Sequence, residues 1–140
     1  MRIHALLIAL IVTPLAVGGA DVHRLAVIVN VDRAVELDLE AIAQIYLKQR
    51  RFWSEGDPII PVNREAGSPS REFFTRRVLH MDATRLGIYW NREYFQGVLP
   101  PATLASDEAI LRFVARDRRA IGYVDPHVLD GSVHVVLYVD

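Results

Sequence analysis

The chain has 140 residues, no cysteine and a formal net charge of −1. This length suits one domain with its own core, and the lack of cysteine excludes a disulfide framework and a lipid attached through an N-terminal cysteine. Because the charges nearly balance, no whole-chain field draws the protein to nucleic acid, and we expect no nucleic-acid partner.

The first twenty residues have the layout of a secretory signal peptide. Arg2 precedes the apolar run 5–17, which is followed by the small residues of 18–20. We therefore expect cleavage after Ala20 and a periplasmic protein made of residues 21–140. The alternative is a retained membrane anchor, but the apolar run, interrupted by Thr13 and Pro14, is shorter than the ~20 residues that span a bilayer.

The first half of residues 21–140 alternates between strand and helix patterns. The β-branched run 24–30 predicts a strand that is buried on both faces. Asp38 suits the N-cap of a helix that ends near Gln49, and the turn residues 54–58 lead to a second strand at 59–62. This β-α-β order predicts that the two strands are parallel with a right-handed crossover.

The second half predicts three helices and two further strands. Ser68 and Pro69 suit the start of a helix, and another helix begins at Ser106 or Asp107. Between them, the helical stretch 82–95 has a predicted buried stripe of Leu86, Tyr89, Trp90 and Tyr94. Segments 120–124 and 132–139 have strand patterns. The sequence therefore predicts a single small α/β layer structure.

Residues 64–70 combine several groups that bind oxyanions. Arg64 offers a planar fork of donors, Gly67 lets the backbone approach a ligand, and Ser68 and Ser70 carry hydroxyls. The unpaired N–H groups and the dipole at a helix start favour an anion there, although Pro69 removes one donor. The alternative is structural: Ser68 only caps the helix, and Arg64 is a solvated charge.

Other chemistry has little support in the sequence. The five histidines are scattered without the spacing of a metal site, so we expect no metal. No motif pairs a nucleophile with a base, so we expect no enzyme activity. A hydrolase of phosphorylated compounds stays open as a weaker alternative, which requires a nucleophile and a base near Arg64.

The pattern Arg64-x-x-x-Ser68-x-Ser70, followed by Phe73 or Phe74, resembles the ligand loop of phosphate-binding proteins of ABC transporters. Residues 39–53 and 59–64 resemble the helix, tryptophan and strand that precede this loop in the family. The segment 120–124, A-I-G-Y-V, resembles the family's return strand. These blocks follow the family's order across residues 24–138.

The resemblance implies an α/β fold of the periplasmic-binding-protein type, a single lobe with a mixed, mostly parallel sheet flanked by helices. It implies that Arg64, Ser68 and Ser70 contact an oxyanion and that Gly67 gives backbone access. The expected protein is an exported, non-enzymatic solute-binding protein without a cofactor. Its ligand would be a small inorganic anion such as phosphate, and its partner an ABC permease.

Two features depart from the family. Full-length members close two lobes over the ligand, and this chain lacks the segments of the other lobe. Pro69 follows Ser68 where the family usually has glycine, which removes a backbone donor. The missing lobe leaves a second function open: an interaction module that docks on another exported protein or forms a homodimer. A large exposed apolar patch beside the loop would favour that second function.

Overall fold

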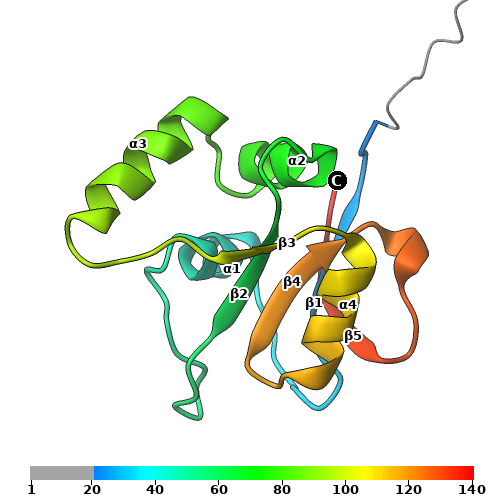
Figure 1. Cartoon of the computed structure of the whole chain (residues 1–140). Helices are drawn as coiled ribbons and strands as arrows, with labels where there is room; N and C mark the ends of the chain where they lie inside the picture. Colours follow the sequence, from blue (N-terminus) through cyan, green and yellow to red (C-terminus); the bar gives the residue numbers. More distant parts are fainter. Residues whose placement is uncertain (1–20) are drawn as a thin grey trace, which may run out of the picture.

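The computed structural model describes residues 21–140, and the predicted signal peptide, 1–20, lies outside the described residues. Cleavage after Ala20 therefore stays a prediction. The strands are β1 (Leu25–Asn30), β2 (Ile60–Arg64), β3 (Ala102–Leu104), β4 (Ala120–Val124) and β5 (Val133–Val139). The helices are α1 (Leu39–Tyr46), α2 (Pro69–Arg77), α3 (Ala83–Tyr94), α4 (Asp107–Arg116) and the 3-10 helix η1 (Pro126–Val128) (Figure 1).

The strands of residues 21–140 form one sheet in the order β3-β2-β4-β1-β5. β2 pairs in parallel with β3 and β4, whereas β1 is antiparallel to β4 and β5. All strands except β1 therefore run the same way, which confirms the predicted mixed, mostly parallel sheet of an α/β fold.

The expected parallel pairing of the first two strands is wrong. β4 lies between β1 and β2, and β1 runs against both. The backbone of β1 is instead paired with the two C-terminal strands, β4 and β5. The sequence pattern identified these segments as strands, but strand order depends on contacts between distant segments that periodicity does not encode.

The sheet separates two apolar layers, and β1 contributes to both of them. Val27 and Val29 join the cluster that includes α1 and α2, while Ala26 and Ile28 join the cluster around α4. Successive strand residues point to opposite faces, so a strand covered on both sides needs an unbroken apolar run. Figure 1 shows α4 in front of the sheet and α1 behind it.

Each of the four α-helices begins with a side chain that caps it. Asp38, Ser68, Asp82 and Ser106 each accept a hydrogen bond from the backbone N–H three residues later. The predicted caps of α1 and α2 are confirmed, and Ser106 rather than Asp107 caps α4. No helix of residues 21–140 combines the length and the apolar character that crossing a membrane requires.

The buried stripe that the sequence predicted on α3 is only partly correct. Leu86 is buried and Trp90 is half-buried, but Tyr94 is 63% exposed. Figure 1 shows α3 projecting away from the sheet. Helical periodicity predicts an apolar face but not the element that covers it, and on much of α3 nothing within residues 21–140 does.

Candidate oxyanion site

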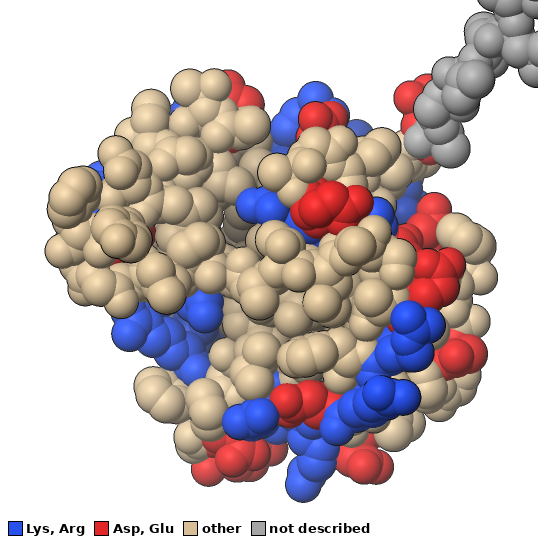
Figure 2. Space-filling model, in the orientation of Figure 1, with Lys and Arg blue, Asp and Glu red and all other residues tan. Residues whose placement is uncertain are grey.

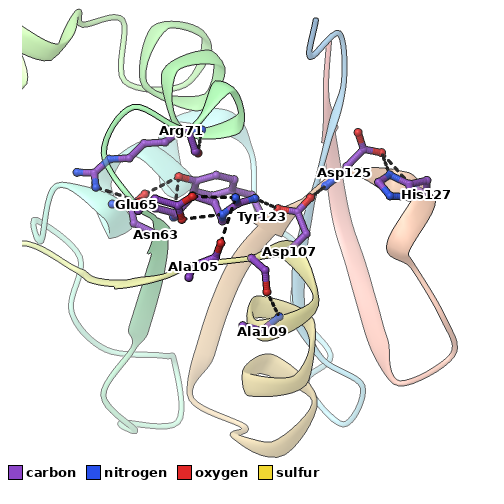
Figure 3. Close-up of polar contacts among 12 residues, drawn as sticks. Asn63, Glu65, Arg71, Ala105, Asp107, Ala109, Tyr123, Asp125 and His127 are labelled. Carbon is purple, nitrogen blue, oxygen red and sulfur yellow. Dashed lines mark hydrogen bonds and ion pairs between the residues drawn. The ribbon is translucent and has the colours of Figure 1, made fainter. Parts of the chain in front are cut away.

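Three parallel strands end side by side at the edge of the sheet where the candidate loop begins. Arg64 ends β2 and pairs in register with Leu104, which ends β3, and Val124 ends β4 on the other side. The segments that follow these strands place Glu65, Asp107 at the start of α4, and Asp125 at one edge (Figure 3). In open α/β sheets, this edge is where ligands usually bind.

The four residues singled out in the sequence lie on one turn that leads into α2. Gly67 has a φ of +84°, a conformation that favours glycine. Ser68 is the N-cap, and its Oγ accepts from the N–H of Arg71 at 3.1 Å. Pro69 occupies the first turn and Ser70 is buried. The capping role of Ser68 is confirmed, while contact of these residues with a ligand stays a prediction.

The guanidinium of Arg64 is not a freely solvated charge. Its Nε and Nη2 donate to the two carboxylate oxygens of Glu65, both at 3.1 Å. Its Nη1 donates to Oδ1 of Asp107, and Nη2 also reaches the carbonyl of Ala105 at 3.4 Å. These bonds use four of the five N–H donors of the guanidinium, so an anion that takes the paired donors Nε and Nη2 must replace Glu65.

Of the two carboxylates on Arg64, that of Glu65 is the easier to displace. The side chain of Glu65 is 46% exposed, whereas that of Asp107 is 11% exposed. Asp107 is also held by the N–H of Asp125, which donates to its Oδ2 at 2.9 Å. The hydrogen bonds from Arg64 lower the pKa of Glu65, and those to Glu65 raise the pKa of Arg64. Both groups are therefore charged at neutral pH.

A buried tyrosine fixes the backbone at the start of the loop. The hydroxyl of Tyr123 donates to Oδ1 of Asn63 at 2.7 Å and accepts from the N–H of Arg64 at 3.3 Å. The ring of Phe74, on α2, stacks on Tyr123 with 4.0 Å between centroids. Burial raises the pKa of Tyr123, so its hydroxyl remains a neutral donor.

A second side chain of α2 reaches back to the loop. Nη1 of Arg71 donates to the carbonyl of Arg64 at 3.0 Å. No sequence pattern indicated a site role for four side chains, those of Glu65, Arg71, Asp107 and Tyr123. Tyr123 lies in the I-G-Y-V segment, and Asp107 lies beside a predicted helix cap. No local sequence pattern indicated that either side chain lies close to Arg64.

The side chains at this edge also bear on the metal and hydrolase alternatives. Within residues 21–140, no group of three or more histidine and acidic side chains could hold a metal ion. In the same range, neither carboxylate on Arg64 is hydrogen-bonded to the hydroxyl of Ser68 or Ser70. At this edge of residues 21–140, neither serine hydroxyl of the loop is therefore paired with a carboxylate base, the pairing that the hydrolase alternative requires.

No protein-family model and no curated protein matches the sequence. Among the solved structures that resemble the chain are proteins of phosphate transport. One is a phosphate ABC transporter substrate-binding protein from Clostridium perfringens, solved with bound phosphate. Its sequence is 28% identical and the TM-score is 0.62, and the match covers 80% of this chain and 43% of that chain. An ABC-type phosphate transport receptor from Vibrio cholerae is 20% identical, with a TM-score of 0.64 and coverage of 89% and 52%.

A third structure, PstS from Borrelia burgdorferi, is 13% identical, with a TM-score of 0.62, 80% of this chain covered and 46% of that one. The chain thus spans about half the length of the proteins it resembles. These likenesses confirm the resemblance to phosphate-type binding proteins that the sequence indicated, and the single-lobe α/β fold that it implied.

Proposed function

We propose that this protein is an exported solute-binding protein and not an enzyme. It binds a phosphate-like oxyanion at the loop 64–70, and its partner is an ABC permease. The observation that carries the proposal is the double hydrogen bond from Arg64 to Glu65. The guanidinium presents two parallel donors to a pair of oxygens held by an exposed side chain. A tetrahedral oxyanion has the same spacing of oxygens and suits the same fork.

Further donors lie beside this fork at the start of α2. The N–H of Ser70 lies in the first turn, where no intrahelical acceptor exists. Within residues 21–140, no hydrogen bond engages the hydroxyl of Ser70, and that of Ser68 accepts from Arg71 and has its proton free to donate. The N–H of Arg71 is taken by the cap. An anion at Arg64 therefore has one backbone donor and two hydroxyls within its loop.

Ligand exchange follows from these contacts. Glu65 moves into solvent, the anion takes its place on Nε and Nη2, and Asp107 keeps Nη1 fixed. Charge at the site hardly changes, because one anionic group replaces another. This exchange favours an anion that presents more acceptor oxygens than a carboxylate does, since the extra oxygens can reach the donors of Ser68 and Ser70.

Calorimetric titration of the purified protein with phosphate, sulfate and acetate at low salt tests the proposal. We expect saturable phosphate binding that Arg64→Ala abolishes and Arg64→Lys weakens, because lysine keeps the charge but not the fork. Arg24→Ala is the matched control, since Arg24 forms an exposed ion pair with Asp140. Phosphate binding that survives Arg64→Ala in a folded sample would contradict the site.

A specific surface favours a second function, an interaction module. Four apolar side chains on and just after α3 are each more than 60% exposed, and we call them the α3 patch: Ile88, Tyr94, Phe95 and Leu99. Figure 2 shows that the surface over α3 carries few charged side chains. Isolated monomers rarely expose such a patch. Because the chain spans about half of the similar structures, we propose a second copy of the chain as the occupant.

Sedimentation velocity over a range of concentrations tests this second function. We expect a dimer that Phe95→Asp converts to a monomer, because the change places a charge in the α3 patch. Glu36→Asp, at an exposed position outside the patch, is the control and should leave the dimer intact. A monomer at every concentration would exclude self-association and leave only a different exported protein as partner.

A further inference from the structure

A groove with a volume of about 340 Å³ lies between α2 and α3. Figure 2 shows the surface hollowed between these helices, with basic side chains at the edge of the hollow. This volume falls at the lower end of the range for small-molecule sites, about 300–1,000 Å³. The groove is therefore large enough for a compact organic molecule and larger than an inorganic anion needs.

Polar groups with unused hydrogen-bonding capacity line one side of the groove. Arg71 and Arg76 both line it, and within residues 21–140 neither forms an ion pair. Thr75 lines it as well and is 5% exposed, and no hydrogen bond inside this range engages its hydroxyl. No fully buried polar side-chain atom of residues 21–140 lacks a hydrogen bond, so the hydroxyl of Thr75 counts as a polar group on the wall of the groove and not as an orphaned one.

The formal charges of the groove balance, because two arginines and two carboxylates line it. Glu72 and Asp82 also line it, but the carboxylate of Asp82 is engaged as the cap of α3, where it accepts from the N–H of Arg85 at 2.8 Å. Two guanidinium groups therefore face one uncommitted carboxylate. Guanidinium donors thus outnumber the carboxylates that are free to pair with them, which favours a ligand with an acidic group.

The opposite side of the groove is apolar, and a glycine keeps it open. Met81, Leu86 and Trp90 form this wall together with Gly87. A Cβ added at Gly87 would meet no atom within 4 Å, so packing inside the protein does not require glycine there. Glycine in the middle of a helix costs ~1 kcal/mol relative to alanine. Its presence on the wall leaves room for a ligand.

We infer that the groove between α2 and α3 binds an organic anion, with its acidic group at Arg71 and Thr75 and a compact apolar group against Met81, Leu86 and Trp90. The ligand class is a phosphate monoester or a carboxylate that carries one small apolar or aromatic group. The inference goes beyond the inorganic anion proposed above and does not depend on Arg64. Gly67 of the loop lines the groove, and Arg71 of α2 lines it and donates to the carbonyl of Arg64, so the two sites adjoin.

Two tryptophans allow a direct test with phenyl phosphate as the probe. Trp90 lines the groove, whereas Trp53 is buried elsewhere and its Nε1 donates to the carbonyl of Arg119 at 3.1 Å. In a ¹⁵N-labelled protein, the indole signal of Trp90, assigned through Trp90→Phe, should shift saturably with phenyl phosphate. The signal of Trp53 should stay in place and so report that the fold is unchanged.

Three variants make the test specific. Arg71→Gln should weaken phenyl phosphate binding at least about tenfold, as the loss of one charge-assisted hydrogen bond predicts. Gly87→Leu should block the groove while keeping the helix. Asn91→Leu, at an exposed position of α3 outside the groove, is its matched control and should bind as the unmodified protein does.

A parallel titration with inorganic phosphate separates this inference from the proposed function. In one outcome, inorganic phosphate shifts the amide signal of Ser70 but not the indole signal of Trp90, and phenyl phosphate leaves the Trp90 signal unchanged. This outcome would support the oxyanion site and overturn the inference about the groove. A shift of Trp90 by phenyl phosphate without any effect of inorganic phosphate would support the groove and contradict the oxyanion site. Full binding by Gly87→Leu would also overturn the inference.

Discussion

Tyr123 and Asn63 join the two central parallel strands where the candidate site begins. The hydroxyl of Tyr123, on β4, donates to Oδ1 of Asn63, on β2, at 2.7 Å. The same hydroxyl accepts from the N–H of Arg64 at 3.3 Å, so it serves both as donor and as acceptor. One buried tyrosine thus satisfies two polar groups of β2 and orients the residue that holds the carboxylates.

Tyr123→Phe should therefore destabilise the protein without disturbing its core. The substitution leaves the amide oxygen of the buried Asn63 without a donor, at a cost of about 1–3 kcal/mol, while the ring still stacks on Phe74. Chemical denaturation should show a lower midpoint with an unchanged slope. Tyr138→Phe, at an exposed position, is the control and should leave the midpoint within error.

Glu65→Gln should strengthen binding of inorganic anions at Arg64. The glutamine is neutral, so it competes less well for the guanidinium than the carboxylate does. Hydrogen bonds from Arg64 lower the pKa of Glu65, so the competing carboxylate stays charged into the acidic range. Calorimetry with sulfate, which stays dianionic above about pH 3, measures the gain. Glu36→Gln is the matched exposed control, and weaker binding by Glu65→Gln would contradict the exchange.

The sequence predicted those features of the fold that depend on neighbouring residues. The apolar run of β1 and the caps at Asp38 and Ser68 all match the structure, because periodicity and capping act within a few residues. The loop 64–70 was also located correctly at a helix start. Its ligand remains a prediction that only binding data test.

Features that depend on distant segments could not be predicted. Arg64 is 43 residues from Asp107, and no local pattern states that the two side chains meet. The order of strands and the exposure of α3 have the same origin, since each depends on which element lies alongside. Sequence patterns therefore identified the four α-helices of residues 21–140, four of the five strands and one loop, but they missed β3 and η1. The charge balance of the site required the tertiary structure.

Titration of His127 should report its pairing with Asp125. Nδ1 of His127 donates to Oδ1 of Asp125 at 2.6 Å, and this hydrogen bond raises the pKa of His127. A raised folded-state pKa stabilises the protein below the unfolded value of ~6.5, and this contribution is lost as pH rises through the folded value. Asp125→Asn should lower the pKa of His127 in an NMR titration, and an unchanged value would show that the pair does not persist.

Gly122→Ala should destabilise the contact between β4 and α4. A Cβ at this position would lie 2.5 Å from Cγ2 of Ile110 and 3.2 Å from Cγ2 of Val114. Overpacking of this kind costs about 1–3 kcal/mol. The double variant Gly122→Ala with Ile110→Ala should lose less stability than the sum of the single variants, because removing the isoleucine side chain relieves the clash. Additive losses would show that the clash is not the cause.

Gly87→Ala and Gly97→Ala should change stability in opposite directions. At both positions a new Cβ meets no atom within 4 Å, so packing does not separate them. Gly97 has a φ of +78°, where alanine is strained by roughly 1–2 kcal/mol, whereas Gly87 lies within α3, where alanine is favoured by ~1 kcal/mol. Thermal denaturation should therefore show a higher midpoint for Gly87→Ala and a lower one for Gly97→Ala. A lower midpoint for Gly87→Ala would mean that the fold itself needs glycine there, and the reason for assigning Gly87 to a ligand groove would be lost.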